Sequence, residues 1–148
     1  MLRHVLILFG AVTLAVPLGC RTEAEVRNPF GRGSEERTQL AAHAAQSEYP
    51  ADAEASDELR AAALVDRRAN TIKVVNFSNE PIRDADIWVN GNFVHRVPSI
   101  PANGSVTLSR SDFYDGSGQN LASVQTAANR IQIVTGDELY NLLGPVFE

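Results

Sequence analysis

Residues 85–97, ADIWVNGNFVHRV, decide the fold class of this chain. Two runs of strand-forming residues, 85–89 and 93–97, flank Asn90-Gly91, and this dipeptide is the strongest short-range signal for a β-hairpin. The first run carries Trp88, a large side chain of the kind that is usually buried. The stretch therefore predicts two antiparallel strands joined by a tight turn.

Further β-branched runs bounded by turn residues predict additional strands at 71–77, 105–109, 130–135 and 138–142. Gly136-Asp137 suits a two-residue type II′ turn between the last two. Residues 121–129 fit either an irregular crossing or a helical turn. The pattern predicts a mainly β fold, a small antiparallel β-sandwich of about six or seven short strands. We expect its core to contain Phe77, Trp88, Phe93 and Ile133.

The amino-terminal segment 1–19 has the parts of a secretory signal peptide: Arg3, an apolar run over 5–16 and small residues before Cys20. A membrane-spanning helix needs roughly 20 apolar residues to cross about 30 Å of hydrocarbon. Here the run breaks at Pro17, so we expect an export signal and no permanent span.

Leu18-Gly19-Cys20 resembles the lipobox of bacterial lipoproteins, although Pro17 stands where that family usually has leucine. The resemblance implies cleavage before Cys20, a diacylglycerol group on its sulfur and acylation of the new amino terminus by a fatty acid such as palmitate. Arg21, in place of an aspartate, favours the outer membrane in that family. The alternative is an ordinary exported protein in which Cys20, the only cysteine, stays a free thiol or forms an intermolecular disulfide.

Residues 20–69 are rich in alanine and charge and poor in large apolar groups, which predicts a flexible, lipid-anchored stalk. Helix-favouring residues allow short helices within it at 34–47 and 53–68. As a coil, such a stalk would span roughly 40 Å. The predicted organisation is thus a signal peptide at 1–19, a stalk at 20–69 and a β-sandwich domain at 70–148.

Charge excludes some partners. The chain has a formal net charge of -5, and it becomes more negative when Arg3 leaves with the signal peptide. A nucleic-acid binder needs a basic surface to displace counterions from phosphates. We therefore expect no nucleic-acid partner, and attachment to membrane lipid only through acylated Cys20.

The polar stretch 112–118, DFYDGSG, contains the most suggestive candidate site. Asp112 and Asp115 are candidate Ca²⁺ ligands because carboxylates beside glycines suit that ion, but the spacing departs from an EF-hand loop. A polar loop with ordinary turn geometry is the simpler interpretation. The aromatic residues Phe113, Tyr114 and Tyr140 form a second candidate, a patch for a protein or glycan. Burial of Phe113 in the core is the alternative.

No histidine has a neighbour at metal-ligand spacing, and we expect His95 to be a partly exposed strand residue. The chain lacks the G-x-S-x-G motif of a nucleophile elbow, so we predict neither catalysis nor a cofactor. The succession of a strand, residues 84–91 and a Pro-Ala-Asn-Gly turn at 101–104 resembles small immunoglobulin-like or fibronectin-type modules of bacterial envelope proteins. No cysteine pair flanks Trp88, so an antibody-type domain is not implied.

These observations predict a non-catalytic envelope lipoprotein whose β-sandwich binds or scaffolds another envelope component, a protein or a glycan. The alternative is an accessory domain that binds Ca²⁺ or a glycan through the loop 112–118. A hydrolase is the third hypothesis.

Overall fold

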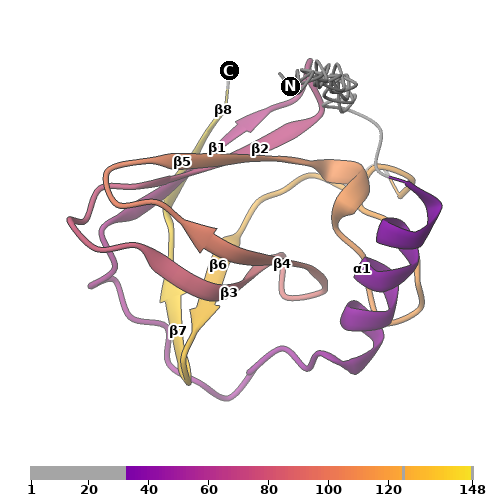
Figure 1. Ribbon diagram of the computed structural model, residues 1–148, viewed down its shortest axis with the longest axis horizontal. Coiled ribbons are helices and arrows are strands. Elements are labelled where there is room, and N and C mark those ends of the chain that lie inside the picture. The colour runs from indigo at the N-terminus through magenta and orange to yellow at the C-terminus, as the bar shows by residue number, and fades with distance from the viewer. Residues whose placement is uncertain (1–32, 125, 148) are drawn as a thin grey trace, which may run out of the picture.

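A computed structural model of the chain describes residues 33–124 and 126–147, so the predicted signal peptide and Cys20 lie outside the described residues. The described residues form one α-helix, one 3₁₀ helix and eight strands (Figure 1). In chain order these are α1 (Ser34–Gln46), β1 (Ala61–Asp66), β2 (Thr71–Asn76), β3 (Ile82–Val89), β4 (Phe93–Ile100), β5 (Ser105–Ser109), η1 (Arg110–Asp112), β6 (Ile131–Thr135), β7 (Glu138–Asn141) and β8 (Leu143–Phe147).

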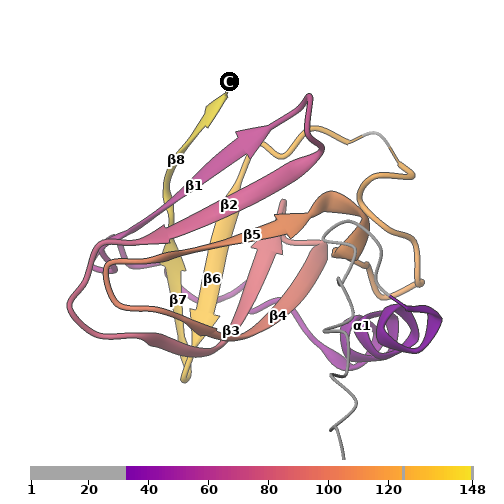
Figure 2. The ribbon, with the colours of Figure 1, turned by 45° about the horizontal axis from the view of Figure 1, so that its top comes forward.

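The strands form two four-stranded sheets with the orders β5-β2-β1-β8 and β4-β3-β6-β7. Neighbouring strands are antiparallel except β1 and β8, which run parallel. Figures 1 and 2 show the two sheets as separate layers, with α1 beside β4. The predicted mainly β sandwich is confirmed. Its inner layer contains the buried apolar residues Ala61, Ala63, Val65, Ile72, Val74, Ile87, Val89, Phe93, Leu108, Phe113, Leu121, Ile131 and Ile133.

Both predicted hairpins are present. In the first, β3 and β4 pair up to Val89 and Phe93, and the turn has positive φ at Asn90 (56°) and Gly91 (70°). A Cβ at position 91 would also lie 3.2 Å from the Tyr49 ring, closer than an ordinary contact, so a side chain there would need the ring to shift. In the second hairpin, β6 and β7 are joined at Gly136, whose φ of 61° fits the expected type II′ turn.

The predicted helix at 53–68 is wrong, because β1 occupies part of that segment. Alanine and leucine favour helices, yet burial along β1 alternates strictly with a period of two: Ala61, Ala63 and Val65 are buried. Pairing with β2 on one side and β8 on the other overrides local propensity. The boundary predicted at residue 70 therefore falls between two paired strands of one sheet.

The predicted helix at 34–47 is confirmed as α1, and it belongs to the folded unit. It packs on the outer face of the β4-β3-β6-β7 sheet, where Ala44 is buried against Trp88, Val94 and Tyr114. Tyr49 continues this outer layer: its ring stands edge-on to Trp88 at 5.4 Å between ring centroids. Its hydroxyl donates to Gln132 Oε1 at 2.6 Å. Trp88 is buried as predicted, but it lies under this layer and not between the sheets.

The expectation that Phe77 lies in the core is wrong, since 47% of its surface is exposed. The alternation of β2 turns Asn76 inward in its place, with no exposed surface. Its side chain donates to the carbonyls of Glu80 (2.8 Å) and Pro101 (3.1 Å), so the buried amide is satisfied by hydrogen bonds to neighbouring loops.

His95 also differs from the expectation of partial exposure. It is 2% exposed and lies on the inner side of β4, with its ring 5.4 Å from that of Phe113. Its Nδ1 is 3.1 Å from the carbonyl oxygen of Asp112. Residues 121–129, ambiguous in sequence, contain no helix in their described part. Asn90 holds the end of this segment by donating to Ala127 O and accepting from Asn129 N.

We predict that a fragment of residues 70–148 does not fold, because it removes β1, the strand between β2 and β8. A fragment of residues 33–148 should unfold cooperatively on heating. Circular dichroism and amide NMR dispersion of the two purified fragments test this. A cooperative transition in the shorter fragment would contradict the role assigned to β1.

We predict that Tyr49→Ala lowers the free energy of unfolding by about 2–3 kcal/mol, because it removes an aromatic contact and a hydrogen bond. Tyr49→Phe keeps the ring and should cost only about 1 kcal/mol. Trp88 is the only tryptophan, so its fluorescence reports directly on the loss of cover. If the Tyr49→Ala protein showed unshifted Trp88 emission and unchanged stability, Tyr49 would not cover Trp88 as described.

Candidate functional site

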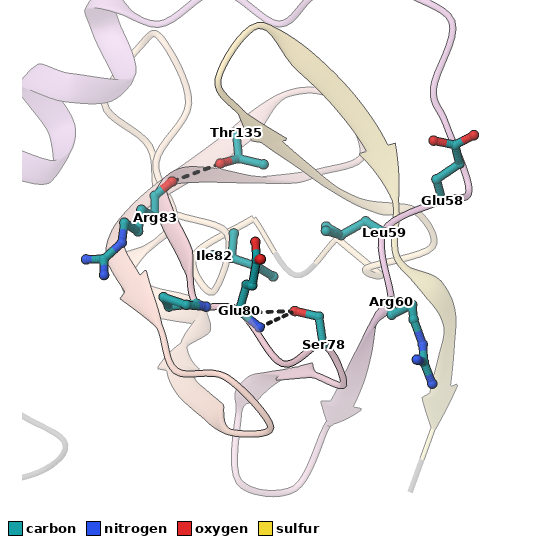
Figure 3. Close-up of a pocket in the computed structure, with 9 residues that line it drawn as sticks. Glu58, Leu59, Arg60, Ser78, Glu80, Ile82, Arg83 and Thr135 are labelled. Atoms are coloured by element: carbon teal, nitrogen blue, oxygen red, sulfur yellow. Dashed lines mark hydrogen bonds between the residues drawn. The ribbon is translucent and has the colours of Figure 1, made fainter.

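A groove of about 690 Å³ opens between the segment that precedes β1 and the start of β3 (Figure 3). Residues 58–60 form one wall. The β2–β3 loop and the first residues of β3 form the other, and Thr135 at the end of β6 closes one end. The groove lies between the two sheets at one end of the sandwich. Residues 58–60 lead into β1 of one sheet, whereas Ile82 and Arg83 begin β3 of the other.

The floor of the groove is apolar. Leu59 is half-buried and packs against the core, and Ile82 is 6% exposed. Figure 3 shows the Leu59 side chain pointing toward Ile82. Pro81 adds a further apolar surface. This combination suits a ligand that places a small apolar group between the two walls.

The rim carries charges of both signs from Glu58, Arg60, Glu80 and Arg83, all exposed. In Figure 3 the Arg60 and Arg83 side chains point away from the middle of the groove, whereas the Glu80 carboxylate points toward it. The electrostatic potential at the rim is therefore neither uniformly positive nor uniformly negative. This argues against a strongly charged ligand and for one of mixed polarity.

Hydrogen bonds hold the loop wall in place. Ser78 Oγ donates to Glu80 O at 2.8 Å, and Asn76 Nδ2 donates to the same carbonyl. Asn103 N donates to Ser78 O at 2.9 Å, which ties the loop to the β4–β5 connection. At the closed end, Thr135 Oγ1 donates to Arg83 O at 2.8 Å. The groove is thus preformed, so a ligand spends little free energy on ordering it.

The candidate Ca²⁺ ligands are engaged elsewhere. Asp112 is buried at the end of η1, and Asp115 Oδ1 accepts from Ser117 N, Ser117 Oγ and Gln119 N at 2.7–2.9 Å. Burial would raise the pKa of Asp115, but the hydrogen bonds from Ser117, Gln119 and Gly118 outweigh it and lower that pKa. Within residues 33–124 and 126–147, no three His, Cys, Asp or Glu side chains gather in a possible metal site. The loop has the Asx-turn geometry of the simpler interpretation.

The aromatic candidates are not brought together. Phe113 is fully buried between the sheets, and Tyr114 is 7% exposed in the outer layer under α1. Tyr140 is half-buried on β7, where its hydroxyl donates to Glu138, and this hydrogen bond is the main cause that raises the pKa of Tyr140. Phe113 and Tyr114 are adjacent in an extended segment and so point to opposite faces. The three rings therefore do not form the candidate exposed patch, and the alternative, burial of Phe113 in the core, is confirmed.

A serine, a histidine and an aspartate do meet at the junction between α1 and β3. His43 Nε2 lies 2.8 Å from Asp86 Oδ1 and 3.1 Å from Ser47 Oγ. In a catalytic triad the carboxylate and the hydroxyl contact different ring nitrogens. Here both contact the same nitrogen, and the Ser47 hydroxyl donates to the His43 carbonyl. The cluster anchors α1 to the sheet, with Arg96 3.8 Å from the other Asp86 oxygen.

Sequence reasoning missed the groove, because residues 58–60 were assigned to the stalk and 78–81 to a turn. No local pattern indicates that these segments meet. Comparison with protein-family models, with curated proteins and with solved structures finds no match to this chain. Among the helices of the described residues, none has the length and apolar character needed to cross a membrane.

We predict that Asp115→Ala destabilises the protein by about 1 kcal/mol, since it removes the acceptor that folds the turn. Because the folded-state pKa of Asp115 is lowered from 3.8, its contribution is complete above that value. It is lost as the pH falls through the folded-state pKa. Thermal melts between pH 2 and 6 measure this.

The matched control is Asp137→Asn, which changes an exposed aspartate in another turn. Its acid profile should follow that of the wild type. An Asp115→Ala protein with the wild-type acid profile would show that the turn does not depend on the ionised carboxylate.

Proposed function

We propose that the protein is a non-catalytic envelope lipoprotein, anchored at the outer membrane through acylated Cys20, whose β-sandwich binds another envelope protein. The observation that carries the proposal is the preformed groove at residues 58–60 and 78–83, on a folded unit that follows a lipobox-like leader. An apolar floor with a mixed-charge rim is the composition expected of a surface that binds another molecule, and this supports the proposal.

The leader supports the anchor. Cys20 is the only cysteine, and acylation would remove an otherwise free thiol in an oxidising compartment. Each buried CH₂ of an acyl chain contributes about 0.8 kcal/mol, so several chains hold a soluble unit on a membrane where one chain would not.

The fold changes the expected reach of the anchor. Because α1 and β1 belong to the folded unit, the chain available as a tether ends near Gly33 and not at residue 69. Between Cys20 and Gly33, a fully extended chain spans at most about 45 Å. The sandwich therefore stays within about one domain diameter of the membrane, where its partner should also be found.

Two observations favour binding over catalysis and a protein over a glycan. The hydroxyl residues of the groove are Ser78 and Thr135. Both hydroxyls donate to backbone carbonyls and so hold the walls of the groove in place. The residues lining the groove include no aromatic ring on which a sugar would stack. The lining is aliphatic and charged, as in surfaces that bind peptides.

We predict that Cys20→Ser abolishes palmitate labelling and lowers the membrane-bound fraction at least tenfold in fractionated cells. Mass spectrometry of the mature amino-terminal peptide gives a direct readout. Thr22→Ala, two residues further along, is the control and should leave labelling intact. A wild-type peptide with an unmodified sulfur at position 20, or an uncut leader, would contradict the anchor.

A further inference from the structure

We propose that strand β5 is a self-association site, at which two copies of this chain pair their β5 strands antiparallel about a two-fold axis at Thr107. The inference goes beyond the proposed function, because it uses neither the groove nor Cys20. It follows from the position of β5 in its sheet, from the directions of its backbone groups and from the order of its side chains.

Strand β5 is the last strand of the sheet β5-β2-β1-β8 (Figure 2). Its five residues, Ser105–Ser109, pair with residues 71–75 of β2 in a register without a shift. Within residues 33–124 and 126–147, β5 pairs with no other strand. One side of β5 is therefore a sheet edge, where backbone N–H and C=O groups have no partner strand.

Two hydrogen bonds at the ends of the paired segment show which backbone groups face β2. Asn76 N donates to Gly104 O at 2.8 Å, and Arg110 N donates to Asn70 O at 3.0 Å. Each residue of an antiparallel ladder directs both of its backbone groups to one side, and successive residues alternate. The even-numbered residues of β5 therefore face β2. The odd-numbered residues direct their backbone groups to the free side: Ser105, Thr107 and Ser109.

The described part of the chain leaves these three residues unbonded on that side. None of the isolated bridges, and none of the backbone hydrogen bonds outside the strand ladders, involves Ser105, Thr107 or Ser109. Ser105 and Thr107 are also exposed. The edge is thus open to a further strand along the length of β5.

The other sheet edges are closed or interrupted. Beside β4, Val94 exchanges backbone hydrogen bonds of 2.8 and 3.2 Å with Tyr114. Beside β7, Ser56 forms two backbone hydrogen bonds of 2.9 Å. The edge strand β8 contains Pro145, which has no N–H to donate. In contrast, β5 contains neither a proline nor a charged residue, the two devices that commonly keep another strand away from an edge.

The side chains of β5 suit pairing with a second copy of the same strand. The sequence Ser-Val-Thr-Leu-Ser has the same order of polar and apolar residues in both directions. An antiparallel copy centred on Thr107 would place Thr107 opposite Thr107, Ser105 opposite Ser109 and Val106 opposite Leu108. Every facing pair then matches in polarity, and the free backbone groups of all three odd-numbered residues are hydrogen-bonded.

The charges near β5 do not oppose this contact, although the chain has a net charge of -5. In the sheet, Lys73 is the β2 residue in register with Thr107. In the pair, the two Lys73 residues would be three strand spacings apart, about 14 Å. This separation exceeds the Debye length of about 8 Å at physiological ionic strength, so their repulsion is largely screened.

The test is sedimentation equilibrium of the purified full chain in a density-matched detergent, which reports the mass of the protein alone. We expect the wild type to be a dimer. Thr107→Glu would place two carboxylates opposite each other, so it should raise the dimer Kd at least tenfold, and Thr107→Lys should do the same. An equimolar mixture of these two variants should regain the dimer, because unlike charges then face each other.

Two further variants separate the edge from other effects. Asn92→Glu adds a negative charge at an exposed turn and should leave the Kd within twofold of wild type. Thr107→Pro removes the outward N–H but keeps the ladder with β2. It should also weaken the dimer at least tenfold, and its circular dichroism should match that of the folded wild type.

A wild type that sediments as a monomer at every concentration up to its solubility limit would overturn the inference. Slow hydrogen exchange of the Thr107 N–H in that monomer would show that another segment occupies the edge. A dimer that persists in both charged variants, or that their mixture does not restore, would have to use a different surface. None of these results would bear on the groove or on acylation of Cys20, because neither contributes to the β5 contact.

Discussion

The pairing of β1 between β2 and β8 is the constraint on which the rest of the structure depends. β1 is antiparallel to β2 and parallel to β8, so the last strand of the chain has its place in the sheet only because β1 precedes the rest of the sandwich. Ala61 and Ala63, both almost fully buried, keep the inner face of this strand small. The same strand fixes the position of residues 58–60 just before it, which make one wall of the groove. A strand that completes the core therefore also builds the candidate binding surface.

The outer layer on the second sheet depends on different forces. α1 exposes most of its surface and is held by Ala44 at the apolar centre and by His43 against Asp86. Tyr49 adds an aromatic contact with Trp88 and a hydrogen bond to Gln132. These contacts give the amino-terminal part of the chain a defined place on the sandwich. Under the proposed anchoring, they set where the tether leaves the folded unit, and thereby how the groove is presented near the membrane.

The candidate sites in the sequence and the groove in the structure differ for a physical reason. Phe113 and Asp115 are candidates in the sequence because aromatic rings and carboxylates often form binding sites. In the structure both stabilise the fold: Phe113 fills the core, and Asp115 accepts the hydrogen bonds of a turn. The groove is lined by Leu59, Ile82 and ordinary charged residues, whose types carry no signal. The groove forms where the segment before β1 meets the start of β3, and such a meeting of separate segments cannot be seen in a list of side chains.

The sequence by itself determined both hairpins, the strands they join and the helix at Ser34–Gln46, because Asn90-Gly91, Gly136 and the alternation of apolar residues act over a few positions. Only the tertiary structure decided that 61–66 is a strand, that Asn76 faces inward while Phe77 faces water, and that residues 58–60 meet the start of β3. Each of these depends on which segments pair across the sheets, and the free energy of such long-range pairing outweighs local preferences of a few tenths of a kcal/mol per residue.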